Sequence, residues 1–109
     1  MRLIKAVIRP ERLYEVITAL EEKGFRGFTV MDVVGRGREG GLKFGEASYM
    51  ELAKTLLMVA VHDEDVERVV EVIKKHASLG MFGDGKVFVC PIEEVWTIRT
   101  GKRELEVQR

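Results

Sequence analysis

The feature that most constrains the fold is one helical pattern that occurs twice at a fixed separation. Apolar residues at i, i+3, i+4 and i+7 lie on one face of a helix. The first copy of this pattern comprises Leu13, Val16, Ile17 and Leu20. The second copy lies 53 positions later and comprises Val66, Val69, Val70 and Ile73. A repeated pattern of this kind indicates two copies of one supersecondary unit.

Each predicted helix lies between two apolar segments that are typical of β-strands. These segments are residues 3–8 and 28–34 around the first helix, and residues 55–61 and 86–92 around the second. Strand, helix, strand therefore occurs twice, which is the βαββαβ order of a ferredoxin-like split βαβ sandwich. We predict an α+β fold with a four-stranded antiparallel sheet and two helices on one face.

The sheet is expected to be apolar on both of its faces. Two helices cover one face, yet residues 56–61 and 87–90 are continuously apolar instead of alternating with polar residues. The 109 residues suffice for one domain, residues 1–109, with a single core. Another copy of the chain is therefore expected to bury the second face.

Composition excludes several classes of protein. The 18 basic and 18 acidic residues balance, which gives no support to a nucleic-acid binder working by bulk charge. A single cysteine, Cys90, excludes an internal disulfide framework and a multi-cysteine metal site. No apolar run approaches the roughly 20 residues of a membrane span. We expect a cytoplasmic protein with no direct membrane insertion, in which Cys90 is buried and Trp96 packs beside the sheet.

Glycines crowd the segment after the second strand, where they are expected to break regular structure. Residues 35–41 formally contain the GxGxxG of a dinucleotide-binding site, but no helical period follows, so a Rossmann interpretation fails. Glycines still allow backbone N–H groups to approach an anion, and Arg36 and Arg38 add charge. A flexible hairpin connection is the alternative interpretation of this segment.

Two further segments combine glycine with basic residues. Residues 80–86 contain Gly83-Asp84-Gly85-Lys86, which favours an anion-binding loop with Lys86 as a point charge, or else a tight turn. Residues 97–103 add Arg99, Lys102 and Arg103. Three such segments in one neutral domain favour a phosphate-bearing ligand.

Fold class alone does not select a function. An RNA-recognition module would carry aromatic residues on the first and third strands, and residues 3–8 and 55–61 contain none. A metal carrier would need a cysteine pair after the first strand. A small acylphosphatase-like enzyme would need an asparagine, which this chain lacks. An amino-acid-sensing regulatory domain remains open at this point.

The glycine-bearing segments resemble those of the P-II nitrogen-regulatory proteins. The matching residues are 28–30 with 35–38, then GDGKVFV at 83–89, then IRTG at 98–101. The resemblance covers residues 1–103. It implies a non-catalytic homotrimer that binds ATP or ADP between subunits and senses 2-oxoglutarate. Its output is binding of target proteins through a long regulatory loop, here residues 37–53, accompanied by a second glycine loop at 79–86 and a C-terminal loop at 97–109.

The resemblance also implies site residues. Thr29 and the backbone near Ala60 would contact adenine. The phosphates would be surrounded by Gly37, Arg38, Gly83, Gly85, Lys86 and Arg99, with Gly35, Arg36 and Asp84 in the same nucleotide-binding set. Lys54 matches the lysine that the family associates with 2-oxoglutarate. The effector-binding set is completed by Glu39, Gly40 and Gly41, with Glu39 as the candidate Mg²⁺ ligand.

Three departures from the family pattern stand out. Glu39 replaces the familiar glutamine that helps to hold Mg²⁺ and 2-oxoglutarate, and Thr97 replaces the first of two C-terminal arginines. The segment between Gly41 and Lys54 is about four residues shorter than in bacterial members, which changes its reach rather than the fold.

The short segment resembles that of the nitrogenase-regulating branch, whose members form mixed complexes with a paralogue. Two alternatives stay open, a P-II regulator of an ammonium transporter and a small phosphate-handling enzyme.

Overall fold

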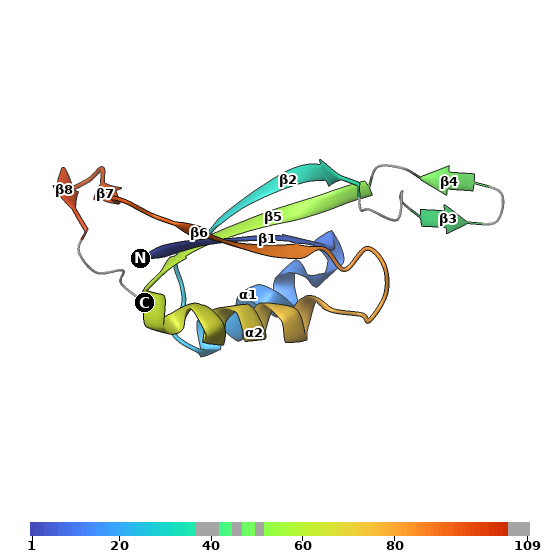
Figure 1. Cartoon of the computed structure of the whole chain (residues 1–109), viewed down its shortest axis with the longest axis horizontal. Coiled ribbons are helices and arrows are strands. Elements are labelled where there is room, and N and C mark those ends of the chain that lie inside the picture. Colours follow the sequence, from blue (N-terminus) through green and yellow to red (C-terminus); the bar gives the residue numbers. More distant parts are fainter. Residues whose placement is uncertain (37–41, 45–46, 50–51, 105–109) are drawn as a thin grey trace.

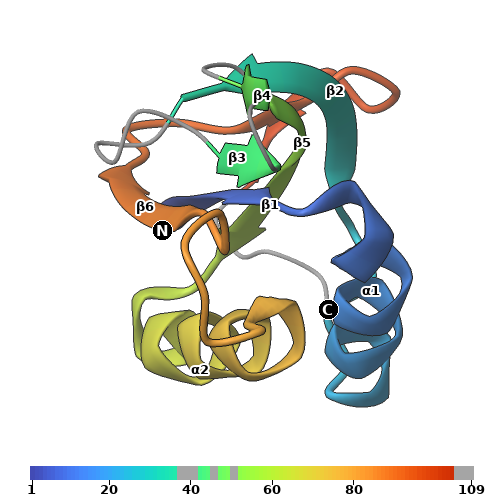
Figure 2. The same cartoon turned by 90° about the vertical axis from the view of Figure 1, so that its right-hand side faces the viewer.

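A computed structural model of the chain describes residues 1–36, 42–44, 47–49 and 52–104. Its centre is an antiparallel sheet in the order β2-β5-β1-β6. Helices α1 (Leu13–Glu22) and α2 (Val66–Ala77) form a second layer on one face of this sheet (Figures 1 and 2). The predicted ferredoxin-like fold is confirmed. The four strands are β1 (Arg2–Ile8), β2 (Thr29–Gly35), β5 (Leu52–Val61) and β6 (Lys86–Pro91).

Each helix is preceded by a 3₁₀ turn, η1 (Pro10–Arg12) or η2 (Asp63–Asp65). Pro10 suits η1 because a first helical turn does not need its missing N–H. Gly24 follows α1 with φ +90°, a conformation that favours glycine, and thereby ends the helix. Arg12 in η1 joins the start of α1 to the end of α2, since its Nε donates to the carbonyl of His76 at 2.9 Å.

The core lies between the helices and the sheet. Val16, Leu20, Val69 and Ile73, which belong to the repeated pattern, are completely buried, and the other four members of that pattern are partly buried. Alternate residues of β1 and β5 face them from the sheet, as expected for a strand with one covered face. These sheet residues are Ile4, Ala6, Ile8, Leu57, Val59 and Val61.

The opposite face of the sheet is largely apolar apart from lysines such as Lys5, and none of the described elements covers it. Directly opposed residues of antiparallel strands share a face, and Met58 opposes Lys5, which in turn opposes Phe88. Phe88 is 48% exposed and Met31 is 47% exposed. Cys90 lies on this same face and is half-buried. The expectation that its thiol is buried was wrong for the single chain, because no layer of the described residues covers this face.

Two short hairpins extend the sheet at its two ends (Figure 1). One pairs β3 (Leu42–Phe44) with β4 (Ala47–Tyr49), so the expectation that glycines abolish regular structure throughout this segment was wrong. Backbone pairing across a tight connection needs no apolar pattern in either strand. The other pairs β7 (Trp96–Thr97) with β8 (Lys102–Arg103).

Trp96 does not pack beside the sheet as expected. Its side chain is 59% exposed, and its indole Nε1 donates to Glu94 at 2.9 Å. The reason is its position in β7, which extends beyond the sheet (Figure 1).

Candidate functional site

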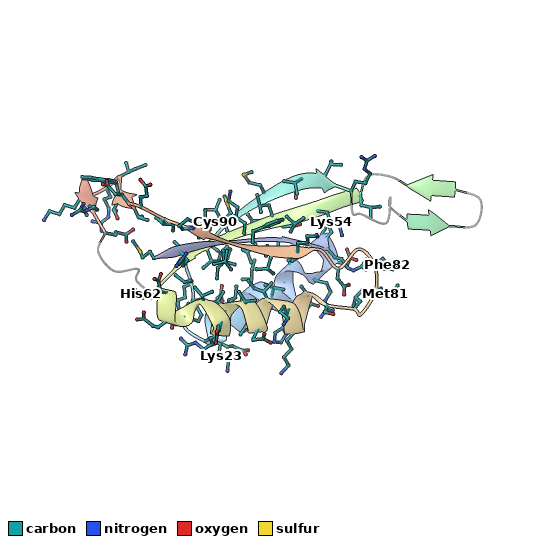
Figure 3. The ribbon with its side chains drawn as sticks, in the orientation of Figure 1. Lys23, Lys54, His62, Met81, Phe82 and Cys90 are labelled. Carbon is teal, nitrogen blue, oxygen red and sulfur yellow. The ribbon has the colours of Figure 1, made fainter. Side chains whose placement is uncertain are left out.

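The loop between α2 and β6 is the place where the described polar side chains converge. Arg9 from the end of β1 and Lys54 from β5 both reach it, although they lie far from it in the sequence. In Figure 3, Lys54, Met81 and Phe82 occupy the end of the molecule from which the β3–β4 hairpin projects. We refer to residues 78–86 as the glycine loop.

The glycine loop requires glycine at specific positions. Gly80, Gly83 and Gly85 have φ values of +77°, +96° and +101°, which L side chains rarely adopt. A Cβ at Gly85 would also lie 1.7 Å from the carbonyl oxygen of Val7, so the loop passes directly against β1. Glycine is needed at position 85 because the loop backbone lies directly against β1, whereas the predicted approach of this loop to an anion stays a prediction.

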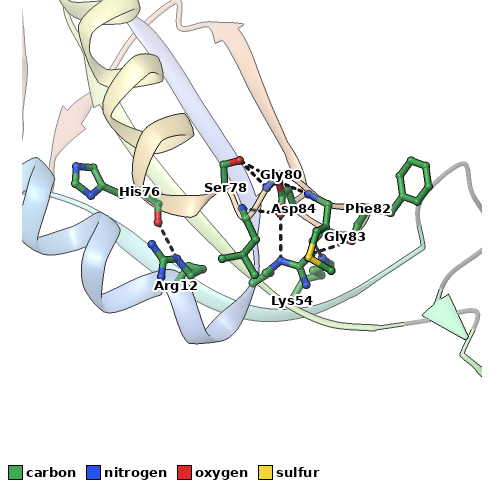
Figure 4. Close-up of polar contacts among 11 residues, drawn as sticks. Arg12, Lys54, His76, Ser78, Gly80, Phe82, Gly83 and Asp84 are labelled. Atoms are coloured by element: carbon green, nitrogen blue, oxygen red, sulfur yellow. Dashed lines mark hydrogen bonds and ion pairs between the residues drawn. The ribbon is translucent and has the colours of Figure 1, made fainter. Parts of the chain in front are cut away.

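Asp84 holds the glycine loop from within. Its carboxylate accepts the backbone N–H groups of Leu79, Gly80 and Met81 at 2.9–3.3 Å (Figure 4). It also accepts the Ser78 hydroxyl at 3.1 Å and Arg9 Nε at 3.2 Å. Burial raises the pKa of this carboxyl, but these hydrogen bonds outweigh it and bring the pKa to about 2.

Arg9 and Lys54 each donate to a carbonyl of the same loop. Arg9 Nη2 donates to the carbonyl of Phe82 at 2.8 Å, and Lys54 Nζ donates to the carbonyl of Gly83. Lys54 is only 8% exposed. Its pKa is lowered first by burial and then by the charge of Arg9, against the opposing effects of Glu11 and Asp84. Sequence reasoning missed Arg9, because nothing local to the basic residue after β1 shows its distant partners.

Lys54 also connects the glycine loop to the end of β2. It opposes Val33 in the sheet register, and a Cβ at Gly35 would lie 3.3 Å from its Cγ. Arg36 follows at the exposed end of β2, and Lys86 is exposed at the first position of β6. The structure thus brings Gly35, Lys54 and the glycine loop into one neighbourhood.

An open groove of about 750 Å³ adjoins the glycine loop between α2 and β6. Its apolar lining includes Val70 and Ile73, and Lys74, Lys75 and Lys86 supply positive charge. The lining also contains Asp84 and Glu71, which pairs with Lys74, so charges of both signs border the groove and it does not by itself select an anionic ligand.

Three predicted nucleotide-binding residues lie elsewhere in the chain. Thr29 opposes Met58, and Ala60 opposes Leu3, both away from the glycine loop along the sheet. Arg99 follows β7 in the hairpin arm at the opposite end of the molecule from that loop (Figure 1). Gly37, Arg38, Glu39, Gly40 and Gly41 lie outside the described residues.

The described part of the chain contains no group of three or more His, Cys, Asp or Glu residues placed to hold a metal ion. Nor does any described helix have the length and apolarity needed to cross a membrane.

The double βαβ sandwich is a ferredoxin-like domain, and at one end of it Arg9 and Lys54 donate hydrogen bonds to the carbonyls of the glycine loop. The family model described as Nitrogen regulatory protein P-II matches residues 1–102. The chain belongs to this P-II family. Its members are regulatory signal-transduction proteins and not enzymes, so the chain is a regulator of nitrogen metabolism. The alternative of a small phosphate-handling enzyme is therefore rejected.

Relatives from methanogenic archaea show where the similarity lies within the family. The chain is 51% identical over 102 residues to the "Nitrogen fixation nifHD region GlnB-like protein 1" of Methanothermococcus thermolithotrophicus, covering 94% of this chain and 97% of that protein. It is 49% identical over 100 residues to the protein of the same name from Methanococcus maripaludis, covering 92% and 95%. It is 47% identical over 106 residues to "Nitrogen regulatory protein P-II 2" of Methanothermobacter thermautotrophicus, covering 94% and 92%. These names identify the Nif-associated branch as the one that the chain most resembles.

Proposed function

We propose that the protein senses ATP or ADP together with 2-oxoglutarate and regulates nitrogenase by direct protein binding. The observation that carries this proposal is the contact between Lys54 and the carbonyl of Gly83. It joins the lysine that the resemblance assigns to 2-oxoglutarate to the loop that the resemblance assigns to phosphate.

The glycine loop fits a nucleotide phosphate. Gly83 and Gly85 have positive φ on either side of Asp84, whose φ is not positive. Alternation of this kind is the backbone pattern of anion-binding nests, and Lys86 adds an exposed charge beside it. Cβ atoms at these glycines would crowd Arg9 and the carbonyl of Val7. Lys86 and the loop would thus hold the phosphates of ATP or ADP.

A trimer explains why the other predicted nucleotide contacts lie far from this loop. Thr29, Ala60 and Arg99 contact the same nucleotide only if they come from a neighbouring copy. The uncovered apolar face of the sheet supplies a reason for copies to associate. Light scattering coupled to size exclusion should give about three times the 12.4 kDa of one chain. A monomer at micromolar concentration would refute this arrangement.

The effector is proposed to bind between Lys54 and residues 39–41. Glu39 is a carboxylate, as is each end of 2-oxoglutarate, so the two repel each other unless a cation lies between them. A Mg²⁺ ion bridging Glu39, 2-oxoglutarate and the phosphates would remove this repulsion. Lys54 can pair with the other end of the effector, because an ammonium group has three donors and the Gly83 carbonyl takes one.

The target is proposed to meet residues 37–53, the segment that contains the β3–β4 hairpin. The nifHD-region names of the relatives favour nitrogenase and a mixed complex with a paralogue. A P-II regulator of an ammonium transporter is the second candidate, supported by the more general name of the Methanothermobacter relative. Inhibition of purified nitrogenase by the protein, relieved by 2-oxoglutarate, would distinguish the first from the second.

The ligand test is calorimetric titration of the assembled protein with ATP, ADP and 2-oxoglutarate, singly and together with Mg²⁺. We expect either nucleotide to bind without turnover, and 2-oxoglutarate to bind only with ATP and Mg²⁺. Failure of both nucleotides to bind would refute the proposal. Hydrogen exchange across residues 38–53 should differ among the apo, ATP-bound and fully liganded states, and identical exchange would rule out this segment as the output.

A further inference from the structure

We propose that Asp84 is a positioning residue that presents the glycine loop to the nucleotide and does not itself contact phosphate or metal. This inference rests on the proposed nucleotide binding and names one residue that makes it work. It also explains why an acidic residue stands in the middle of a loop that is proposed to bind a polyanion.

The carboxylate of Asp84 has no free capacity for a ligand. Two oxygens offer about four lone-pair sites. One oxygen of Asp84 accepts Arg9 Nε and the Leu79 N–H, and the other accepts the Ser78 hydroxyl and the N–H groups of Gly80 and Met81. Five donors therefore occupy it, which leaves no room for a Mg²⁺ ion or a ligand hydroxyl.

The negative charge of Asp84 also opposes direct contact with phosphate. A bare carboxylate a few ångströms from a triphosphate costs binding energy through repulsion. The pairing with Arg9 and the hydrogen bonds from the loop offset that charge locally. Asp84 thus serves the site through the backbone that it holds, since its own charge opposes the ligand.

The backbone that Asp84 holds also has a defined direction. Arg9, the ion-pair partner of Asp84, also donates to the carbonyl of Phe82. In a planar trans peptide the carbonyl and the following N–H point in opposite directions. The N–H of Gly83 therefore points away from Arg9. Asp84 and Arg9 together fix the orientation of the Gly83 N–H, from which a phosphate oxygen can accept a hydrogen bond.

The experiment compares Asp84→Asn with the matched control Asp63→Asn in the full chain. Like Asp84, Asp63 is an ion-paired aspartate, and its partners are the N-terminal amine and Arg2. It lies in η2, outside the glycine loop. Hydrogen exchange at the amides of residues 79–81 is measured without ligand, and the affinity for ADP and ATP is measured by calorimetry with Mg²⁺ and with a chelator.

We expect Asp84→Asn to speed exchange at residues 79–81 about tenfold and to weaken both nucleotides about tenfold, equally with and without Mg²⁺. Exchange in the middle of α2 should stay at the wild-type level, which shows an intact fold, and Asp63→Asn should change nothing in the loop. Ser78→Ala removes one donor but keeps the carboxylate, so it should shift loop exchange in the same direction by a smaller factor. If Asp84→Asn does not fold, the Ser78→Ala variant is used to test the proposal instead.

Three results would overturn the proposal. Tighter nucleotide binding by Asp84→Asn would mean that the carboxylate acts only as a nearby repulsive charge. A loss seen only with Mg²⁺ would make it a metal ligand. Unchanged exchange at residues 79–81 would mean that it does not hold the loop. Failure of the wild-type protein to bind ATP or ADP refutes the proposed function itself, whereas a binding-competent wild type with an unaffected Asp84→Asn variant refutes only this role.

Discussion

Gly85 offers the sharpest test of how the glycine loop is built. We predict that Gly85→Ala destabilises the protein much more than Gly80→Ala, although both glycines lie in the same loop with positive φ. At Gly80 a Cβ meets nothing within 4 Å, so only backbone strain is added. At Gly85 the Cβ would lie 1.7 Å from the carbonyl oxygen of Val7.

The expected magnitudes follow from these two environments. Left-handed backbone strain costs about 1–2 kcal/mol, which is the whole effect expected for Gly80→Ala. The contact at Gly85 must lengthen to about 3.5 Å, so the loop must move away from β1 by well over 1 Å. Loss of one or two hydrogen bonds where β6 begins adds about 0.5–1.5 kcal/mol each. We expect a total of about 1.5–5 kcal/mol for Gly85→Ala.

The assay is urea unfolding of both variants and of Gly27→Ala at one protein concentration, because association contributes to the stability of an oligomer. Gly27 has neither positive φ nor a neighbour within 4 Å, so its alanine variant should match the wild type or exceed it slightly. Gly85→Ala should also lose nucleotide binding while Gly80→Ala retains it. Equal destabilisation of Gly80→Ala and Gly85→Ala would refute the close approach to Val7 and with it our account of the loop.

Four further predictions concern ligands, assembly and acid. Lys86→Ala should weaken ATP binding by about 1.5–3 kcal/mol, at least tenfold by calorimetry, because a charge-assisted hydrogen bond is lost. An ATP affinity equal to that of the wild type would show that the phosphates do not bind at Lys86. Met58→Lys should yield monomers in light scattering by burying an unpaired charge, whereas a trimer would contradict the assigned face. In calorimetry, chelation of Mg²⁺ should abolish the binding of 2-oxoglutarate. The Glu39→Gln variant should bind 2-oxoglutarate with the same affinity as the wild type or more tightly. The pKa of Asp84 is about 2 against a usual 3.8, so its contribution to the free energy of unfolding is present above pH 3.8 and is lost as the pH falls from there toward 2. After solvent screening we expect this contribution to be about 1–2 kcal/mol. Acid unfolding of Asp84→Asn should not show it.

The fold could be predicted from the sequence because its main determinant is periodic. A stripe of apolar residues at helical spacing stabilises the protein when it packs against an apolar layer. The repeat made the prediction of both helices consistent, and Ile73 and Leu20 are completely buried as their positions require. Continuous apolar strands likewise predicted a second apolar face, which Met58 and Phe88 occupy.

Side-chain facing within those strands could not be predicted from composition, because a strand that is apolar throughout has no pattern to mark its sides. Val59 and Val87 look as suitable for a subunit contact as Met58 does. The register shows that Val59 faces the helices, where it is 3% exposed, and that Val87 packs against the same core. Only the pairing of β5 and of β6 with β1 separates the two sets.

The contacts of the glycine loop were beyond the sequence for a different reason. Arg9 and Asp84 are 75 positions apart, and nothing in the segment around either residue specifies the other. A GDGK segment is consistent with a solvated turn as well as with a phosphate loop. What separates these interpretations is the set of side chains that other elements bring to the loop, and this set exists only once the β1–β5 and β1–β6 registers are formed.

Lys54 is the residue in which two separately predicted features become one. The sequence presents it as the end of a long loop, 29 positions before Gly83, whose carbonyl it binds. Its stem lies beside Gly35 at the end of β2, so one side chain touches both β2 and the glycine loop. Burial lowers its pKa and makes an isolated charge costly there, which favours any arrangement that brings an anion close to it. Because its ammonium group has donors to spare, an anion can bind without releasing Gly83. A ligand on Lys54 and a ligand on the glycine loop would therefore share one support, and any effect of one on the free energy of binding the other would be reciprocal.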